Sequence, residues 1–167
     1  MFRRSRGAIT LNLSEGECDL LRRTISEYVD LLSADSTDPV VQRLYPRAST
    51  DEKVADEYQE LIGGTLEAEK RTAAEKVRWS LGESGKRRGP VAEEDQQAWL
   101  TVLTDIRLAI GARIGITEEM MLVEPDPEDP EQFPLAVLHW LAFLQETLVR
   151  SLMPGVRFPE PPLRSSD

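Results

Sequence analysis

The clearest pattern of hydrophobic and polar positions runs from Glu93 to Ile116, a segment long enough for about six helical turns. Apolar side chains recur there at steps of four, three, four and four residues, as on one face of an α-helix. These positions are Trp99, Leu103, Ile106, Ile110 and Ile114. A strip of short side chains runs along the same helix and would let another helix approach closely: Ala98, Thr101, Asp105, Ala109 and Ala112. We expect this helix to organise the fold.

Apolar and polar residues alternate from Ala8 to Leu13, which predicts a short β-strand. A strand needs a partner, and the sequence suggests either the segment 156–158 or another subunit. Ser14 and Glu17 then have the spacing of a capping box, in which each side chain satisfies a free backbone amide. The sequence therefore predicts a helix that begins after Ser14 and runs to about Leu32.

Residues 39–45 have the composition of a short helical turn. A longer helix is expected from a cap at Thr50 or Asp51 to Leu81. Gly63 and Gly64 would at most kink it, and Thr65 could cap its continuation. Residues 82–90, GESGKRRGP, have the composition of a loop.

Gly115 and Thr117 should close the organising helix, and residues 117–120 are suited to one further turn. Residues 124–132, EPDPEDPEQ, predict an acidic, extended surface loop. A last helix begins at Pro134 and is apolar on most of its sides. Such a helix is normally buried on most sides, so we expect it in the middle of a bundle or at a subunit interface.

Together these segments predict an all-α fold, a helical bundle of about five helices with a short N-terminal strand. With 167 residues the chain fits one domain, residues 1–167. We expect residues 1–7 and 155–167 to form flexible or irregular tails.

The net charge of −10 disfavours general binding to a phosphate backbone unless basic residues are concentrated locally. Basic residues are concentrated in two segments, 3–6 and 86–88. The candidate nucleic-acid contacts in them are Arg3, Arg4, Arg6, Lys86, Arg87 and Arg88. A solvated surface loop is the plainer interpretation of the second cluster.

No apolar stretch of signal-peptide length follows the basic N-terminus, so a cytoplasmic protein is expected. The longest apolar segment, 134–153, contains His139, Gln145, Glu146 and Arg150. A membrane-spanning helix needs about 20 mostly apolar residues with few charges. Because of these polar and charged side chains, a buried helix is favoured.

The inventory of reactive side chains gives little support for catalysis. Cys18 is the single cysteine of this sequence, which excludes a disulfide within it and a cysteine-rich zinc site. Its place in the first turn of a predicted helix could lower its thiol pKa, so Cys18 is a redox candidate beside the plainer role of a packed residue. His139 is the single histidine, and neither metal-ligand spacing nor a phosphate-binding loop is present. We expect no enzyme activity and no cofactor.

Arg107 and Arg113 fall on the margins of the apolar stripe, where a guanidinium must reach water or meet a carboxylate. Ion pairs to Asp105, Glu57 or Glu146 that hold helices together are the plainer interpretation. The alternative is that Asp105, Arg107 and Arg113 mark a site for an anionic ligand or for an acidic motif of another protein.

Four segments carry a resemblance to a known family: Asp38–Pro46, Ala55–Tyr58, Trp99–Arg113 and Trp140–Leu148. In this order they resemble an actinobacterial domain-of-unknown-function family that includes AosR-type oxidative-stress transcriptional regulators. The resemblance extends from about Leu11 to Leu152, and the WL…DxRL…GxR segment is its most specific part.

The resemblance implies a regulator of gene expression that works through a sigma factor or RNA polymerase. It also implies redox sensing by disulfide formation in some members, a switch that Cys18 cannot perform within this sequence. Our leading prediction is a non-enzymatic, homodimeric regulatory protein that binds other proteins. Direct DNA binding through the basic segments is the second hypothesis, and binding of a small anionic ligand is the third.

Overall fold

The computed structural model describes residues 1–34, 37–45 and 52–155, and in 52–62 it describes only the side chains of 53, 54 and 57. Nine elements follow one another along the described chain. They are β1 (Phe2–Ser5), β2 (Ala8–Leu13), α1 (Glu15–Leu32), α2 (Pro39–Leu44), α3 (Glu52–Leu81), β3 (Arg87–Pro90), α4 (Glu93–Ile114), α5 (Glu118–Leu122) and α6 (Phe133–Leu152).

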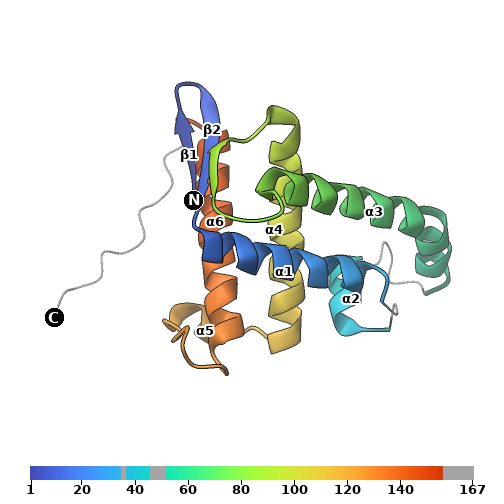
Figure 1. Ribbon diagram of the computed structural model, residues 1–167. Helices are drawn as coiled ribbons and strands as arrows, with labels where there is room; N and C mark the ends of the chain where they lie inside the picture. The colour runs from blue at the N-terminus through green and yellow to red at the C-terminus, as the bar shows by residue number, and fades with distance from the viewer. Residues whose placement is uncertain (35–36, 46–51, 156–167) are drawn as a thin grey trace.

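Helix α4 lies at the centre, as its apolar stripe predicted. It packs against α1, α2, α3 and α6, and α4 and α6 stand side by side while α1 crosses them (Figure 1). Trp99, Leu103 and Ile106 are fully buried on it. Helix α6 does not lie in the middle of the bundle, one of the two places expected for it. It packs mainly against α4 and β1 and leaves Phe133 and Phe143 exposed.

The predicted strand Ala8–Leu13 is confirmed as β2, but it pairs with segments that we did not expect to be strands. It lies between β1 and β3 in an antiparallel sheet of order β1-β2-β3. Phe2 pairs with Leu11, and Asn12 pairs with Arg88. The expectations of a tail at residues 1–7 and of a loop throughout 82–90 were therefore wrong, and the proposed partner segment 156–158 lies outside the described residues.

Sequence pattern could not reveal these partners for a physical reason. Segments β1 and β3 are four residues each, rich in arginine, and β3 contains both Gly89 and Pro90. Such segments have low strand propensity and form only against an existing strand. The turn between β1 and β2 is a two-residue loop in which Arg6 (φ 50°) and Gly7 (φ 85°) both have positive φ, as a tight hairpin requires.

The fold is therefore largely helical rather than purely α. The described part of the chain contains six helices and the small three-stranded sheet. The sheet closes the helical core, because Ile9, Leu11 and Leu13 are buried on its inner face. Phe2 contacts Trp99 of α4 edge to face, with ring centroids 5.3 Å apart.

Local signals fixed the ends of several helices as predicted. Both halves of the capping box between Ser14 and Glu17 are present at the start of α1. Gly115 ends α4 in the left-handed conformation (φ 61°). Thr117 caps α5. Helix α3 continues through the Gly63-Gly64 pair, so no new cap at Thr65 is formed, and a cap at residues 50–51 lies outside the described residues.

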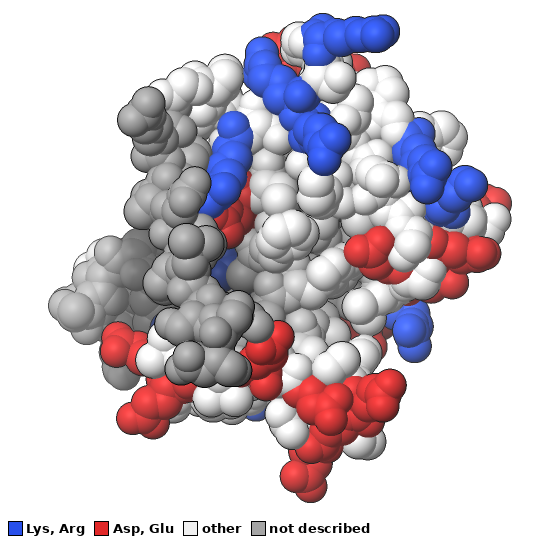
Figure 2. Space-filling view, turned by 90° about the vertical axis from the view of Figure 1, so that its left-hand side faces the viewer, with Lys and Arg blue, Asp and Glu red and all other residues white. Residues whose placement is uncertain are grey.

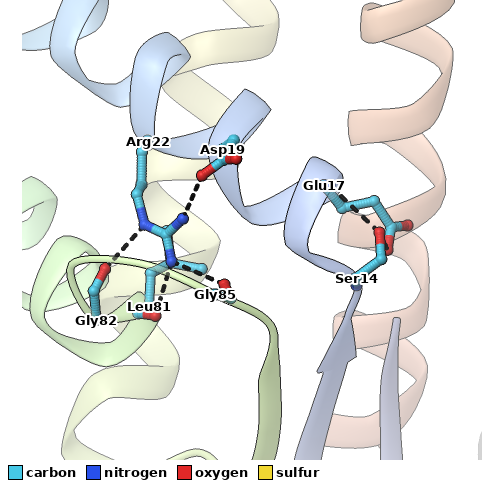
Figure 3. Close-up of polar contacts among 7 residues, drawn as sticks. All are labelled: Ser14, Glu17, Asp19, Arg22, Leu81, Gly82 and Gly85. Atoms are coloured by element: carbon cyan, nitrogen blue, oxygen red, sulfur yellow. Dashed lines mark hydrogen bonds and ion pairs between the residues drawn. The ribbon is translucent and has the colours of Figure 1, made fainter.

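Arg22 of α1 fixes the connection between α3 and β3 (Figure 3). Its Nε donates to the carbonyl oxygen of Gly82 at 2.9 Å, and one terminal nitrogen donates to that of Gly85 at 3.0 Å. Its other terminal nitrogen pairs with Asp19 at 2.6 Å. The guanidinium thus satisfies carbonyl groups after the end of α3 and sets the path by which the chain reaches the sheet.

Candidate functional site

Asp105, placed by sequence with two arginines, is instead buried in a different polar cluster. Its side chain pairs with Lys70 of α3, with 2.6 Å between Oδ2 and Nζ. The same oxygen accepts a hydrogen bond from the hydroxyl of Tyr28 of α1 at 2.5 Å. Asp105 is 6% exposed and Lys70 is 9% exposed. The cluster therefore joins α1, α3 and α4 inside the core.

The surroundings of this cluster favour a structural role. Burial and the contact with Asp105 raise the pKa of Tyr28 well above its ordinary value. The ring of Tyr45 lies 5.9 Å from the Lys70 ammonium, and burial raises the pKa of Tyr45 to about 12. Both tyrosines are therefore neutral at physiological pH, and only the Tyr28 hydroxyl donates to the carboxylate. The buried Lys70 cation faces the buried Asp105 carboxylate within this cluster. Lys70 was missed from sequence because it lies in a run of charged residues, EAEKR, typical of an exposed helix.

Arg107 links α4 to α6 through the neutral amide side chain of Gln145. One of its terminal nitrogens donates to the side-chain oxygen of Gln145, whose amide nitrogen donates to the Thr104 hydroxyl at 2.8 Å. Burial lowers the pKa of Arg107. Among the described residues, Arg107 Nε is buried without a hydrogen-bond partner. Two of the three acidic partners expected for it are engaged elsewhere, since Asp105 binds Lys70 and Glu146 pairs with Arg150.

Arg113, the third residue of the expected site, lies apart from Asp105 and Arg107. It is exposed and lines a cavity of about 360 Å³ between α1, α4 and the start of α6. Arg107 lines a separate hollow beside α2 and α5. The structure therefore divides the trio among a buried cluster and two different hollows.

Cys18 has an environment that disfavours redox chemistry. It is fully buried in α1, and burial raises its thiol pKa, which is opposite to the shift expected from a helix N-terminus. A thiolate is the reactive form of cysteine, and a buried, less acidic thiol reaches that form less readily.

The two basic segments meet across β2. The strand register places Arg3 beside Thr10 and Arg88 beside Asn12, on the outward face of the sheet. Neighbouring strands lie about 4.8 Å apart, so β1 and β3 are separated by about 10 Å. Figure 2 shows basic side chains mostly on the upper part of one face of the molecule and acidic ones mostly from the middle of that face downward.

Two of the six basic candidates serve the fold. Arg87 donates to the carbonyl oxygen of Ser80 at 2.7 Å, and Arg4 donates to that of Ser151 at 3.2 Å. The remaining four are exposed: Arg3, Arg6, Lys86 and Arg88.

A surface that the sequence analysis missed lies where α5 meets α4 and α6. Five large apolar side chains are exposed there, and we call them the Met121 surface: Leu108, Met121, Leu122, Val123 and Phe143. Leu122 is 87% exposed. Met121 lines two hollows, one shared with Phe143 and the other with Leu108, so the hollows adjoin. The signal in the sequence is the apolar run 120–123, which spans the end of the short helix α5 and precedes an acidic loop.

Large exposed apolar patches on soluble proteins mark interaction sites. Ten large apolar side chains are exposed in the described chain, and half of them belong to the Met121 surface. His139 lines one of its hollows, and the Nε2 atom of this ring is buried without a hydrogen-bond partner among the described residues. The Met121 surface is therefore the strongest candidate for contact with another molecule.

Two further searches cover the described residues. No group of three or more histidine, cysteine or acidic side chains in them is arranged to hold a metal ion. No helix in the same part of the chain has the length and hydrophobicity needed to cross a membrane.

Comparison with known proteins decides the family. The model of a domain of unknown function, DUF2017, matches residues 1–152. The chain belongs to the DUF2017 family. The match covers every described element of the fold, and it confirms the resemblance seen in the sequence.

Curated relatives of this DUF2017 chain have the name oxidative stress regulator AosR. They come from Mycobacterium bovis and from two strains of Mycobacterium tuberculosis. Each is 28% identical over 139 residues, an alignment that covers 70% of this chain and 59% of the relative. The chain thus spans less than two thirds of the length of these relatives. No solved structure matches the chain.

Proposed function

We propose that this DUF2017 protein is a non-enzymatic cytoplasmic regulator that acts by binding another protein through the Met121 surface. The observation that carries the proposal is the cluster of five exposed apolar side chains around two adjoining hollows. Burying an exposed leucine or phenylalanine side chain contributes about 1.5–3 kcal/mol, so a few such residues suffice for a specific contact. The relatives named as oxidative stress regulators support the regulatory part.

The chemistry around this surface favours a partner with apolar anchors flanked by basic residues. An acidic loop, 124–132, borders the surface. Asp126 accepts a hydrogen bond from the backbone amide of Glu128, and Asp129 accepts one from that of Glu131, both at 2.9 Å. Gln132 also donates to Asp129 at 2.7 Å. These bonds give the loop a defined shape, and a preformed acidic border attracts and orients a basic partner at little entropic cost.

The partner class that we propose is a sigma factor or RNA polymerase, with the protein acting as a homodimer in the oxidative-stress response. The sigma-factor or polymerase partner rests on the family resemblance, and the oxidative-stress role rests on that resemblance and on the names of the relatives. Dimerisation is tested by light scattering across micromolar concentrations, where a dimer mass is expected and a constant monomer mass would contradict it.

A binding assay with purified components tests the Met121 surface. Immobilised protein is exposed to purified RNA polymerase core enzyme and to individual sigma factors. Leu122→Arg should weaken binding at least tenfold, since it places a charge at the centre of the apolar contact. Trp79→Arg is the matched control, because Trp79 is 88% exposed on α3, away from this surface. Equal loss in both variants, or binding unchanged by Leu122→Arg, would overturn the assignment.

Direct DNA binding is the second candidate function, and the outward face of the sheet favours it. That face brings two basic segments, distant in sequence, into neighbouring positions around β2. We expect any duplex binding to fall steeply between 50 and 200 mM salt, by a factor that grows with the number of phosphates contacted (roughly 10³ for six contacts). Arg3→Ala with Arg88→Ala should reduce both the affinity and the salt slope. A flat salt dependence at low affinity would remove this candidate.

A further inference from the structure

The cavity between α1, α4 and the start of α6 has the features of a small-molecule site. Its volume of about 360 Å³ falls within the range of about 300–1,000 Å³ found for ligand pockets. Its walls are mainly aliphatic and include Leu20, Leu31, Ile106, Ile110 and Val137. An apolar ligand body is therefore suited to its interior.

The two hydroxyl groups that line the cavity have no free proton to donate to a ligand. The ring of Tyr28 lines it, but the hydroxyl of that residue is engaged with Asp105. The Thr24 hydroxyl donates to the carbonyl oxygen of Leu20 at 2.8 Å. A ligand whose hydrogen-bond acceptor lies beside these hydroxyls would leave that acceptor unsatisfied, at a cost of about 1–3 kcal/mol.

Charged side chains line the exposed part of the cavity. Arg23 comes from α1 and Arg113 from α4, so two arginines from different helices line it. Glu27 lies one turn beyond Arg23 on the same side of α1. Two positive charges and one negative charge favour a head group that has one negative charge, and the carboxylate of Glu27 disfavours a doubly charged phosphate.

We propose that this cavity binds a monoanionic amphiphile, a single carboxylate on an aliphatic or aromatic body of medium length. The carboxylate lies between Arg23 and Arg113, and the apolar body lies against the walls of α1, α4 and α6. This inference does not depend on the proposed function, because the cavity shares no lining residue with the hollows of the Met121 surface.

Three probes of equal chain length separate charge recognition from simple apolar binding: octanoate, octanol and octylamine. We expect octanoate to bind at least tenfold more tightly than the other two in calorimetric titration. Arg113→Gln should weaken octanoate about tenfold, the effect of removing one charge-assisted hydrogen bond, and should leave octanol unchanged. Arg78→Gln is the matched control, since Arg78 lines a different hollow on α3.

A second variant tests the location of the site. Ile110→Trp fills the cavity from α4 at a partly buried position, and it should abolish octanoate binding while the helical circular dichroism signal is retained. Equal affinity for octanoate and octanol, unchanged octanoate affinity in Arg113→Gln, or full binding by the folded Ile110→Trp variant would each overturn the proposal. A second copy of the chain seated on the cavity would also overturn it, and would appear as a dimer that Ile110→Trp dissociates.

Discussion

Replacing Lys70 by methionine should destabilise the protein strongly, because it leaves the Asp105 carboxylate buried without its cation. At the observed 2.6 Å, and with an effective dielectric constant of about 20, the attraction between the two charges is about 6 kcal/mol. Desolvation of both groups offsets most of that gain. Removal of one partner alone nevertheless costs about 3–5 kcal/mol, since the remaining charge stays in the core.

A double-mutant cycle measures this coupling. Lys70→Met, Asp105→Asn and the double variant are unfolded in urea and followed by circular dichroism. With a slope of about 2 kcal/mol per molar urea, each single variant should lower the midpoint by about 1.5–2.5 M. The double variant should be at least 2 kcal/mol more stable than the sum of the two losses predicts, because neither unpaired charge remains.

The pair Arg150–Glu146 provides the matched control. Its nitrogen and oxygen are also 2.6 Å apart, but its side chains are 43% and 53% exposed. Exposed pairs contribute about 0–1 kcal/mol, so Glu146→Gln should barely move the midpoint. Additive losses in the Lys70–Asp105 cycle, or a loss for Lys70→Met as small as that for Glu146→Gln, would refute the reasoning.

Three further predictions follow from particular contacts. Arg22→Ala should lower the free energy of unfolding by about 2–3 kcal/mol, because it removes the hydrogen bonds to the carbonyl groups. Asp19→Ala removes only a partly exposed ion pair and should lower it by less than about 1 kcal/mol. Urea unfolding of the two variants measures both losses. Cys18 should react with a thiol reagent only as fast as the protein unfolds, and labelling of the native protein within seconds would contradict its burial. Ser14→Ala should cost about 1 kcal/mol at pH 7. Partial burial tends to raise the pKa of Glu17, but hydrogen bonds from Ser14 lower it overall, so this stabilisation exists above the unfolded pKa of Glu17. The difference between Ser14→Ala and the native protein should therefore shrink as the pH falls through the folded pKa, and a constant difference between pH 7 and pH 3 would contradict it.

The sequence by itself determined most of the helical framework. Helix ends depend on groups a few residues apart, such as Ser14 with Glu17 or the glycine at position 115. Helix faces likewise follow from a period of 3.6 residues, which is visible in the stripe from Trp99 to Ile114. Such signals are local, so the span of α1, the strand β2 and the central place of α4 could all be predicted.

Tertiary structure decided everything that depends on segments distant in sequence. Strands β1 and β3 exist because β2 lies between them, and their own residues have little preference for strands. Lys70 is 35 positions from Asp105, and only the packing of α3 on α4 makes it a buried cation instead of a surface one. Periodicity also cannot tell which apolar residues remain uncovered, since burial depends on the neighbours that the fold supplies. The Met121 surface and the cavity beside Arg113 were for that reason visible only once the helices had been placed against one another.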